Sequence, residues 1–370
     1  MLKTRYDYPL AITMWDFSWL ERRWPGAGYE DWDQALDELK ERGYDAVRID
    51  AYPHLVAADP EKEWELLPVW NQQDWGSPAL NRVQVQPHLN QFIEKCRERN
   101  LKVGLSTWFR EDRANTRMQI KNPHDLGQIW KETLDTIAQA GLLDTILYVD
   151  LCNEFPLTAW AAFLPEITPR VPLETPISRT TTEGAAWMAD SIAVVRESYP
   201  NLDYCFSFCT ELDTWQEQDV TALDLLELHI WVPLFSDFNQ QVGYNFERFD
   251  SIGYENLVQK GEKLYRENPE HWKNCLAQGI ASMAAWSNFA GLPVITTECW
   301  SIVDYKDWPL LDWGWIKELC EFGVVTASNT GRWVAIGTSN FCGPQFKGMW
   351  RDVAWHQRLT GLIHAGKLPA

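Results

Sequence analysis

The sequence predicts an α/β protein, a (β/α)8 TIM barrel that residues 1–370 form as a single domain. Two observations lead to this prediction. Short apolar runs alternate along the chain with longer segments in which apolar residues recur at helical spacing. Polar or charged residues follow most of the apolar runs directly. Alternating strands and helices form parallel, right-handed units, and eight such units close into a barrel with its active site at the carboxyl ends of the strands.

The expected strands are the short apolar runs, which span residues 10–14, 45–51, 101–107, 146–151, 204–210, 225–230, 293–298 and 333–337. Helices are expected between them, at residues 29–42, 87–96, 123–140, 180–198, 271–289, 313–321 and 349–364. Start and stop signals support three of the boundaries. Asn122 precedes Pro123, Thr180 to Glu183 matches a capping box, and Gly43 is a typical helix end.

Three long segments with little periodicity follow strands two, four and six, at residues 52–86, 155–179 and 231–269. Loops of this length are usually functional or disordered. Trp64, Trp70 and Trp75 in the first segment argue against disorder. We therefore expect three long loops that rise from the catalytic face of the barrel.

Composition and charge favour a small neutral carbohydrate as the partner. The net charge of −19 would repel nucleic acid and an anionic membrane surface. Trp (22 residues) outnumbers both Phe (15) and Tyr (12), and the flat indole face suits the C–H faces of sugar rings. The sequence leaves the oligomeric state open.

The cysteines and histidines give no sign of a metal or cofactor. The 8 cysteines lack metal-ligand spacing, and since four of them lie in or beside expected buried strands (Cys152, Cys205, Cys209 and Cys299), we expect reduced thiols. The 7 histidines include no close pair. The amino-terminal residues lack an apolar signal sequence, and no later segment is apolar enough for a membrane helix. We expect a cytoplasmic protein with no cofactor and no metal.

Two strand ends present one carboxylate each. The buried run at residues 146–151 leads to Asn153 and Glu154, and the run from Pro293 leads to Glu298. Two carboxylates at one barrel mouth suit glycosidic bond cleavage, in which one protonates the departing oxygen and the other attacks the sugar. An isolated Asn-Glu pair is more often an ordinary strand end than a catalytic site, so the prediction depends on the second run, which leads to Glu298.

At this point the chain resembles the clan A retaining glycoside hydrolases, which share a (β/α)8 barrel and include the family 5 cellulases and their cellulase-like relatives. The resemblance implies that Glu154 is the acid/base and Glu298 the nucleophile. Val47-Arg48-Ile49 is similar to the family's strand-two motif, whose arginine hydrogen-bonds the nucleophile. His229 in His-Ile-Trp is similar to the family's His-x-Tyr on strand six.

The chain departs from the family pattern in three places. Phe155 separates Glu154 from Pro156, which changes the turn slightly. Trp231 stands where a tyrosine normally donates to the nucleophile. The end of strand eight lacks the tryptophan that the family stacks against the sugar, and Trp300 is a possible substitute.

Further residues are candidates for sugar contact. Asn153 is expected to bind the sugar 2-hydroxyl, and His229 fits a core histidine and a substrate contact equally well. Strand-end position alone makes candidates of Trp15, Asp16, Trp108 and Asn340, and Trp231 is a further candidate for sugar contact. Alternation along strand four places Asp150 on the inner face, where it is a structural partner for Arg48.

The expected chemistry is double displacement on short oligosaccharides or small β-glycosides bound in a closed-ended pocket, with the two carboxylates about 5 Å apart. Arg48 should keep Glu298 ionised, and burial beside Glu298 should raise the pKa of Glu154. Two alternatives stay open. One is a metal-dependent sugar isomerase or epimerase whose ligands are Glu154, Glu211, His229 and Glu298, and the other is a sugar-binding protein without turnover.

Overall fold

The computed structural model describes residues 2, 5–69, 77, 79–165, 175–244, 251–305, 307 and 311–369. Its centre is a nine-stranded parallel sheet in the order β7-β6-β5-β2-β1-β13-β11-β9-β8. The two end strands, β7 and β8, are separated in the sequence by Phe206 alone. They form one interrupted strand, so the sheet closes on itself and the predicted (β/α)8 barrel is confirmed.

The sheet strands lie at the predicted positions. Their bounds are Leu10–Asp16 (β1), Ala46–Asp50 (β2), Lys102–Ser106 (β5), Ile146–Asp150 (β6), Tyr204–Cys205 (β7), Ser207–Phe208 (β8), Leu226–Leu228 (β9), Val294–Thr296 (β11) and Trp333–Gly337 (β13). Strands six and seven continue beyond the sheet as a separate parallel pair, β10 (Ile230–Trp231) and β12 (Cys299–Trp300). This pair carries the chain toward the barrel mouth.

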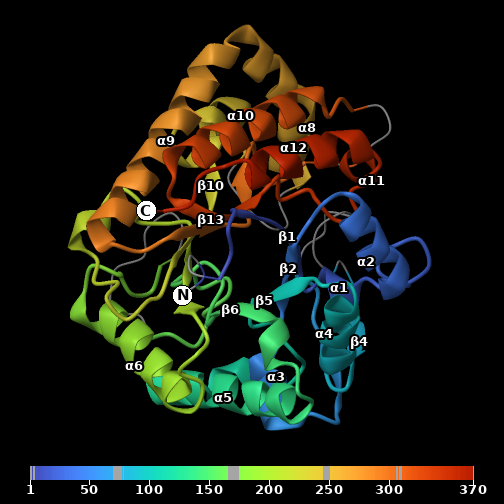
Figure 1. The fold of residues 1–370 in the computed structure, drawn as a ribbon, viewed down its shortest axis with the longest axis vertical. Helices are drawn as coiled ribbons and strands as arrows, with labels where there is room; N and C mark the ends of the chain where they lie inside the picture. Colours follow the sequence, from blue (N-terminus) through green and yellow to red (C-terminus); the bar gives the residue numbers. More distant parts are fainter. Residues whose placement is uncertain are drawn as a thin grey trace.

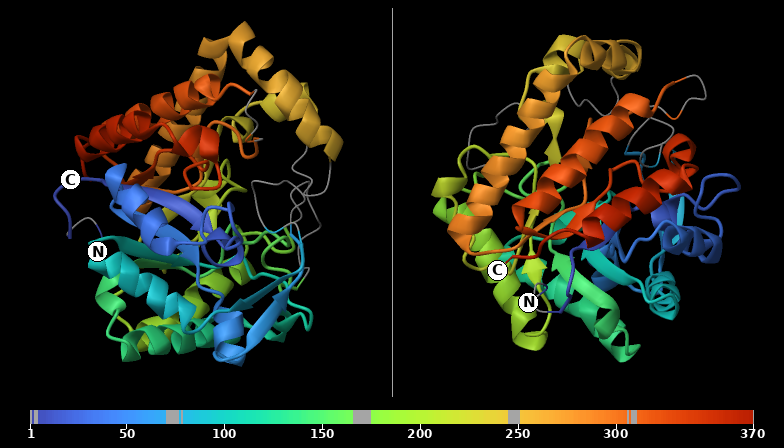
Figure 2. Two further views of the ribbon diagram at one scale, coloured as in Figure 1. Left: turned by 90° about the vertical axis from the view of Figure 1, so that its right-hand side faces the viewer. Right: turned by 45° about the horizontal axis from the view of Figure 1, so that its top comes forward.

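Helices cover the outside of the barrel. They are α2 (Trp32–Glu41), α4 (His88–Glu98), α5 (Pro123–Gln139), α6 (Thr182–Ser198), α9 (Pro269–Ala290), α10 (Gly314–Thr330) and α12 (Val353–His364). Figure 1 shows α9, α10 and α12 on one side of the strands and α5 and α6 on the other, and Figure 2 shows this arrangement from two further directions. Each helix buries an apolar stripe against the sheet.

Some predicted helix boundaries are confirmed, and others lie at different residues. Asn122 caps α5 by accepting from the backbone N–H of Asp125 at 2.9 Å. Thr181 rather than Thr180 caps α6. Helix α10 continues past its predicted end, and the last predicted helix is divided into a short α11 (Lys347–Trp350) and α12.

The long connection after strand two contains regular secondary structure. It contains α3 (Pro53–Ala58) and an antiparallel pair of β3 (Glu63–Leu66) and β4 (Asn81–Gln84). Trp64 is buried in β3, whereas Trp70 and Trp75 lie outside the described residues. A further short helix, α1 (Ser18–Glu21), follows β1.

The prediction of an irregular segment at residues 231–269 is wrong. It contains α7 (Phe238–Val242) and the long helix α8 (Ser251–Glu267). Helix α8 buries Tyr254, Leu257 and Tyr265, which recur at helical spacing but stand in a polar segment that includes two glycines. The apolar stripe is therefore narrow, and tertiary packing stabilises a helix that local sequence favours only weakly.

The interior of the barrel changes character along its axis. At the amino ends of the strands it is filled by apolar side chains, which include Leu10, Ile12, Leu225 and Ile295. A Cβ atom on Gly104 would lie 2.7 Å from the ring of Tyr148, so the glycine makes room for that ring. Toward the carboxyl ends the interior becomes charged, with Arg48, Asp150, Glu227 and His229 all fully buried.

Two sequence expectations concern the rest of the chain. In the part of the chain that the structure describes, no helix combines the length and hydropathy needed to cross a membrane. The cytoplasmic location stays a prediction. All 8 cysteines are free thiols, as expected.

Candidate active site

Glu154 and Glu298 meet at the mouth of the barrel. Glu154 follows β6, and Glu298 lies between β11 and β12. One oxygen of each carboxylate and one ring nitrogen of His229 all lie within 4.8 Å of one another. The two glutamate side chains are only 12% and 10% exposed. Glu154 has a φ of 49°, a left-handed conformation that costs energy for a residue with a Cβ atom and often marks a functional site.

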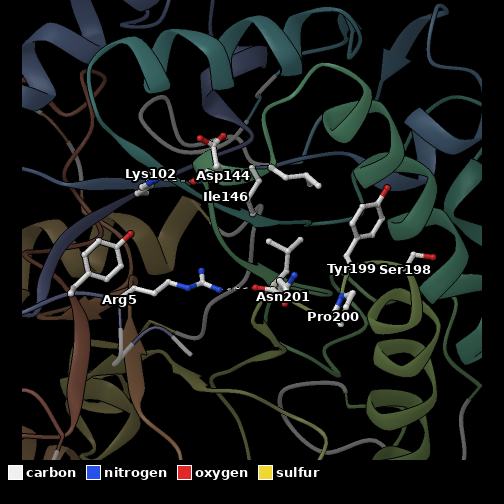
Figure 3. Close-up of a pocket in the computed structure, with 11 residues that line it drawn as sticks. Arg5, Lys102, Asp144, Ile146, Ser198, Tyr199, Pro200 and Asn201 are labelled. Carbon is white, nitrogen blue, oxygen red and sulfur yellow. Dashed lines mark hydrogen bonds between the residues drawn. The ribbon is translucent and has the colours of Figure 1, made fainter.

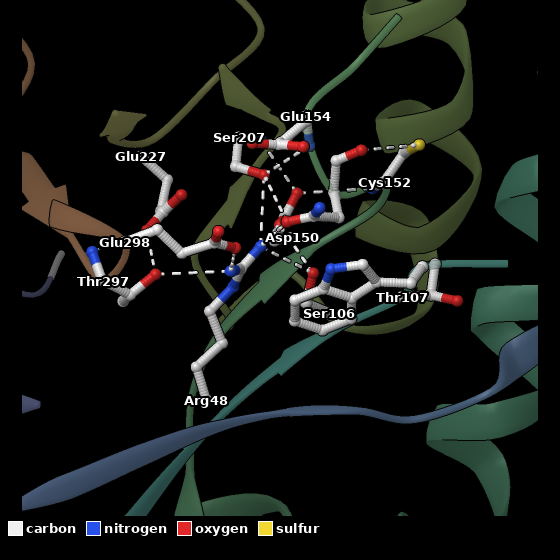
Figure 4. A network of polar contacts seen from close by, with 12 residues as sticks. Arg48, Ser106, Thr107, Asp150, Cys152, Glu154, Ser207, Glu227, Thr297 and Glu298 are labelled. Atoms are coloured by element: carbon white, nitrogen blue, oxygen red, sulfur yellow. Dashed lines mark hydrogen bonds and ion pairs between the residues drawn. The ribbon is translucent and has the colours of Figure 1, made fainter. Parts of the chain in front are cut away.

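Arg48 is the centre of the polar network inside the barrel (Figure 4). Its Nη1 donates to Glu298 Oε1 at 3.0 Å, and its Nη2 donates to Asp150 Oδ2 at 2.6 Å. Ser106 Oγ also donates to Asp150 Oδ2, and the backbone N–H of Ser207 donates to Asp150 Oδ1. The expected pairings of Arg48 with Glu298 and with Asp150 are present. Since Asp150 is itself held by several donors, it fixes the guanidinium that faces Glu298.

Asn153 offers a donor to the space between the carboxylates. Its side-chain Oδ1 accepts from Arg48 Nη2 at 2.6 Å, and its backbone N–H donates to Thr107. Within the described residues the buried Nδ2 has no hydrogen-bond partner. A buried amide donor without a partner is costly, so Nδ2 is suited to a hydroxyl group of a ligand.

Glu154 is held from two sides. The indole Nε1 of Trp160 donates to its Oε2 at 2.9 Å, and His229 Nδ1 lies 3.0 Å from its Oε1. The backbone N–H of Glu154 donates to Ser207 Oγ at 2.9 Å. These contacts fix both the carboxylate and the strained backbone that carries it.

Among the residues that the structure describes, no tyrosine is hydrogen-bonded to Glu298, although the family pattern contains such a contact. Trp231, at that position, donates its indole N–H to Asn340 Oδ1 at 3.3 Å. The neighbours of Glu298 are Arg48 and His229, whose Nε2 lies 3.6 Å from Glu298 Oε1. Arg48 and His229 therefore place positive charge beside Glu298.

The pKa values of the two glutamates run opposite to the expectation. Burial raises the pKa of Glu154, but the hydrogen bond and positive charge of His229 outweigh burial, so this pKa lies below its ordinary value. Burial raises the pKa of Glu298 to about 7, with the charge of Glu154 adding to the shift. The expectation of a raised pKa at Glu154 is wrong because it left out the histidine between the two carboxylates.

Two aspartates near the glutamates are also protonated more readily than usual. Burial raises the pKa of Asp16, the last residue of β1, to about 7, and its Oδ1 accepts from the backbone N–H of Ser18 at 2.5 Å. Burial likewise raises the pKa of Asp304 to about 7, with a contribution from Glu154. Near neutral pH both groups can donate as well as accept hydrogen bonds.

The comparisons with known proteins agree with this geometry. A family model with the name "Cellulase-like" and the description "Sugar-binding cellulase-like" matches residues 12–364. The chain belongs to the cellulase-like family. A crystal structure from Parabacteroides distasonis, described provisionally as a glycoside hydrolase, is 52% identical, with a TM-score of 0.93 over 98% of this chain and 95% of that one. Among curated proteins the comparison finds no match.

More distant structures share the fold of this cellulase-like protein. A family 5 xyloglucan-specific endo-β-1,4-glucanase from a metagenomic library is 14% identical, with a TM-score of 0.52 over 97% of both chains. A family 5 mannosidase from Rhizomucor miehei is 10% identical, with a TM-score of 0.54 over 96% of this chain and 93% of that one. At these identities the likeness concerns the barrel alone.

Two tryptophans expected at the mouth of the cellulase-like barrel lie elsewhere. Trp15 is fully buried and contacts Tyr29, Phe92 and Trp350 on the outer side of the barrel. Trp300 is fully buried beneath α10, where a Cβ atom on Gly323 would lie 2.5 Å from its ring. Neither ring offers a face to a sugar, which corrects both expectations.

The remaining candidates lie at the mouth but have protein partners. The guanidinium of Arg48 lies 4.7 Å from the centroid of the Trp108 ring. Asn340 Oδ1 accepts from Trp231, and its Nδ2 donates to Val303. Sugar contact by Trp108, Trp231, Asn340 and Asp16 stays a prediction.

Glu211 does not join the carboxylate cluster. It accepts from the hydroxyl of Ser178 and from the backbone N–H of Arg179, and so ties the loop after β6 to the end of strand five. The expected four-residue metal set is thus reduced to Glu154, His229 and Glu298. A divalent cation there would lie beside the Arg48 guanidinium, which already binds Glu298 Oε1.

A separate cavity of about 600 Å³ opens at the opposite end of the barrel (Figure 3). Lys102 and Ile146, at the amino ends of β5 and β6, line it. Its two cationic side chains, Arg5 and Lys102, donate to the backbone carbonyls of Asn201 and Asp144. The catalytic residues of a barrel lie at the other end, so this cavity is not the active site.

Sequence reasoning missed three residues of the site. Glu227 is a buried carboxylate beside His229, and its only sequence signal is a charge inside the apolar run at residues 225–230. Trp160 and Asp304 come from loops without periodicity, so no pattern indicated them. Their positions depend on how loops fold over the barrel.

Proposed function

We propose that this cellulase-like protein is a retaining β-glycoside hydrolase. The observation that carries the proposal is the pair of Glu154 and Glu298, with carboxylate oxygens within 4.8 Å at the barrel mouth. Retaining enzymes hold their two carboxyl groups about 5–5.5 Å apart, whereas inverting enzymes need a wider gap for water. The family and the 52% identical structure described as a glycoside hydrolase support the same class of reaction.

In the first step, Glu298 attacks the anomeric carbon while Glu154 protonates the departing oxygen. The glycosidic bond breaks, and the sugar becomes covalently attached to Glu298. In the second step, Glu154 takes a proton from water, whose oxygen displaces Glu298 and releases the sugar. Arg48 supports this division because its guanidinium stabilises the ionised Glu298 carboxylate.

Asn153 is the proposed contact for the sugar 2-hydroxyl. Its side-chain amide is held by Arg48 through Oδ1, which leaves Nδ2 as a donor without a partner among the described residues. A donor fixed in this way can bind more tightly as charge develops on the sugar ring.

The proposed substrates are short β-linked oligosaccharides or small β-glycosides. The net charge of −19 supports a neutral ligand over an anionic one. The catalytic carboxylates are nearly buried, which supports an enclosed site over an open cleft.

The metal-dependent isomerase is the second candidate, and the cluster of Glu154, His229 and Glu298 favours it. Barrel isomerases bind divalent cations through carboxylates and imidazoles. Two charges oppose it here: Arg48 on Glu298, and a proton on His229, whose pKa is raised to about 10. A ligand histidine must be neutral to bind a metal.

The test is a screen against chromogenic aryl β-glycosides of common sugars, with and without a chelator, followed by NMR of the anomeric configuration of the first product. We expect release of the aryl group, resistance to chelation and a β-configured product. Loss of activity on chelation would favour the isomerase class. Sugar binding in the absence of any turnover would favour a binding protein, and an α-configured product would contradict the retaining mechanism.

A further inference from the structure

Glu227 is a buried carboxylate that the two-carboxylate reaction does not use. It lies on β9, two residues before His229, and is fully buried inside the barrel. Its Oε1 accepts from the backbone N–H and the hydroxyl of Thr297, at 3.1 and 2.6 Å. Its Oε2 lies 2.9 Å from His229 Nε2. A buried carboxylate needs a cationic or hydrogen-bonding partner, and His229 is the group placed to supply the charge.

His229 lies between Glu227 and Glu154. Its Nε2 faces Glu227, and its Nδ1 lies 3.0 Å from Glu154 Oε1 on the other side of the ring. The ring is fully buried. Ionised carboxylates only accept hydrogen bonds, so a histidine between two of them is bound best when both ring nitrogens carry a proton.

We propose that Glu227 is a positioning residue that keeps His229 protonated, and that His229 stores the proton which Glu154 delivers to the departing oxygen. This inference rests on the proposed glycoside hydrolase function. It assigns a role to a third carboxylate, which lies on a different barrel strand from either catalytic glutamate.

The proton balance of the cycle is as follows. In the free enzyme His229 is an imidazolium and Glu154 is a carboxylate. When substrate binds, the proton on Nδ1 crosses to Glu154 Oε1, which leaves a neutral imidazole and a carboxylic acid. Glu154 then gives this proton to the departing oxygen as the glycosidic bond breaks. In the second step Glu154 takes a proton from the attacking water and returns it to His229 Nδ1.

The charges around His229 support this role for Glu227. The ring of His229 contacts three carboxylates, those of Glu154, Glu227 and Glu298. Glu298 is also paired with Arg48, which is paired in turn with Asp150. Asp304 and Cys209 also interact electrostatically with Glu154. Burial lowers the pKa of His229, but the charges of Glu298 and Glu227 and the hydrogen bonds raise it to about 10. Removing the charge of Glu227 should lower that pKa.

The experiment compares the pH dependence of kcat/KM for the wild type and Glu227→Gln, which keeps the shape of the side chain and removes its charge. For a β-glycoside with a poor leaving group, the alkaline limb should move down by about 1–3 pH units, the range expected for loss of a nearby charge. For an activated aryl glycoside, whose leaving group needs no proton, the first step should keep its rate, and kcat/KM should stay level at alkaline pH in both proteins.

Two further variants separate this role from a structural one. Glu227→Asp keeps the charge and should return the alkaline limb toward the wild-type position. Glu211→Gln removes another carboxylate at the same mouth, outside the cluster, and should leave the limb unchanged. An alkaline limb that stays at the wild-type pH in folded Glu227→Gln would overturn the proposal.

A measurement on the wild type keeps the test independent of variant folding and of turnover. NMR of 15N-labelled histidine, with His229→Gln to assign the signal, reports the protonation of each ring nitrogen. We expect both nitrogens of His229 to stay protonated at pH 8. A neutral His229 at that pH would overturn the proposal even if glycosides are hydrolysed, whereas a protonated His229 without any turnover would count against the proposed function alone.

Discussion

Arg48 Nη1 lies 3.0 Å from Glu298 Oε1, and the same guanidinium is locked by Asp150 at 2.6 Å. The positive charge of Arg48 is thus fixed beside Glu298, whereas His229 and Trp160 contact Glu154. The two carboxylates have unlike partners, which is the arrangement that separates a nucleophile from an acid/base.

The first prediction concerns Glu298→Gly. Loss of the nucleophile should reduce turnover to about the uncatalysed background, and added azide should restore activity with an inverted product, because a small anion can occupy the vacated space. Product NMR with an activated aryl glycoside provides the measurement. If azide instead rescues Glu154→Ala with inversion, the roles of the two glutamates must be exchanged.

The second prediction concerns Glu154→Ala. For poor leaving groups the first step should slow by about 10²–10⁴-fold, the usual contribution of a general acid. Activated leaving groups need no proton, so pre-steady-state kinetics should show a burst followed by slow hydrolysis. Equal losses for both kinds of leaving group would contradict an acid/base role.

The third prediction is the acidic limb of the pH profile. Since the pKa of Glu298 is about 7, the nucleophile binds a proton below that pH and cannot attack. The value of kcat/KM for an activated aryl glycoside should fall about tenfold for each pH unit below 7 and level off above it. A profile with full activity at pH 5 would contradict this assignment.

The fourth prediction concerns the stability of Arg48→Met. The substitution leaves Asp150 buried without its cationic partner, so the free energy of unfolding should fall by about 3–5 kcal/mol. Urea unfolding followed by circular dichroism measures it. Lys131→Met, at an ion pair on the surface of α5, is the matched control and should cost less than about 1 kcal/mol. Similar losses in the two variants would show that burial of the Arg48 pair is not decisive.

The fifth prediction is release of one terminal sugar at a time. The nearly buried carboxylates suit a closed-ended pocket, although Trp70 and Trp75, expected in its wall, lie outside the described residues. Products from a defined β-linked oligosaccharide series should shorten by single units. Preferred cleavage in the middle of long polymers would contradict the pocket.

The sequence by itself determined the barrel fold and placed Glu154 and Glu298 at its mouth, and their catalytic roles stay a prediction. Periodicity is a local property, so the strand runs, the intervening helices and the strand ends at Glu154 and Glu298 could be found along the chain. Strand alternation also placed Asp150 on the inner face, where the structure shows it bound to Arg48.

Alternation further explains an error that the sequence could have prevented. Trp15 and Asp16 are neighbours on β1, so they cannot both face the barrel mouth. Alternation could not predict the direction of the Trp300 side chain, because Trp300 lies two residues after Glu298, where the backbone leaves the sheet and pairs with β10. Its direction depends on the strand that it pairs with.

Only the tertiary structure decided which residues of the site carry a proton near neutral pH. Local sequence cannot show that His229 stands between Glu154 and Glu227, because the three residues come from two strands brought together by barrel closure. The pKa of a buried carboxylate depends on burial and on charges within a few ångströms, whatever their separation along the chain. For this reason the sequence could place Glu154 and Glu298 at one barrel mouth, whereas it predicted the directions of their pKa shifts the wrong way round.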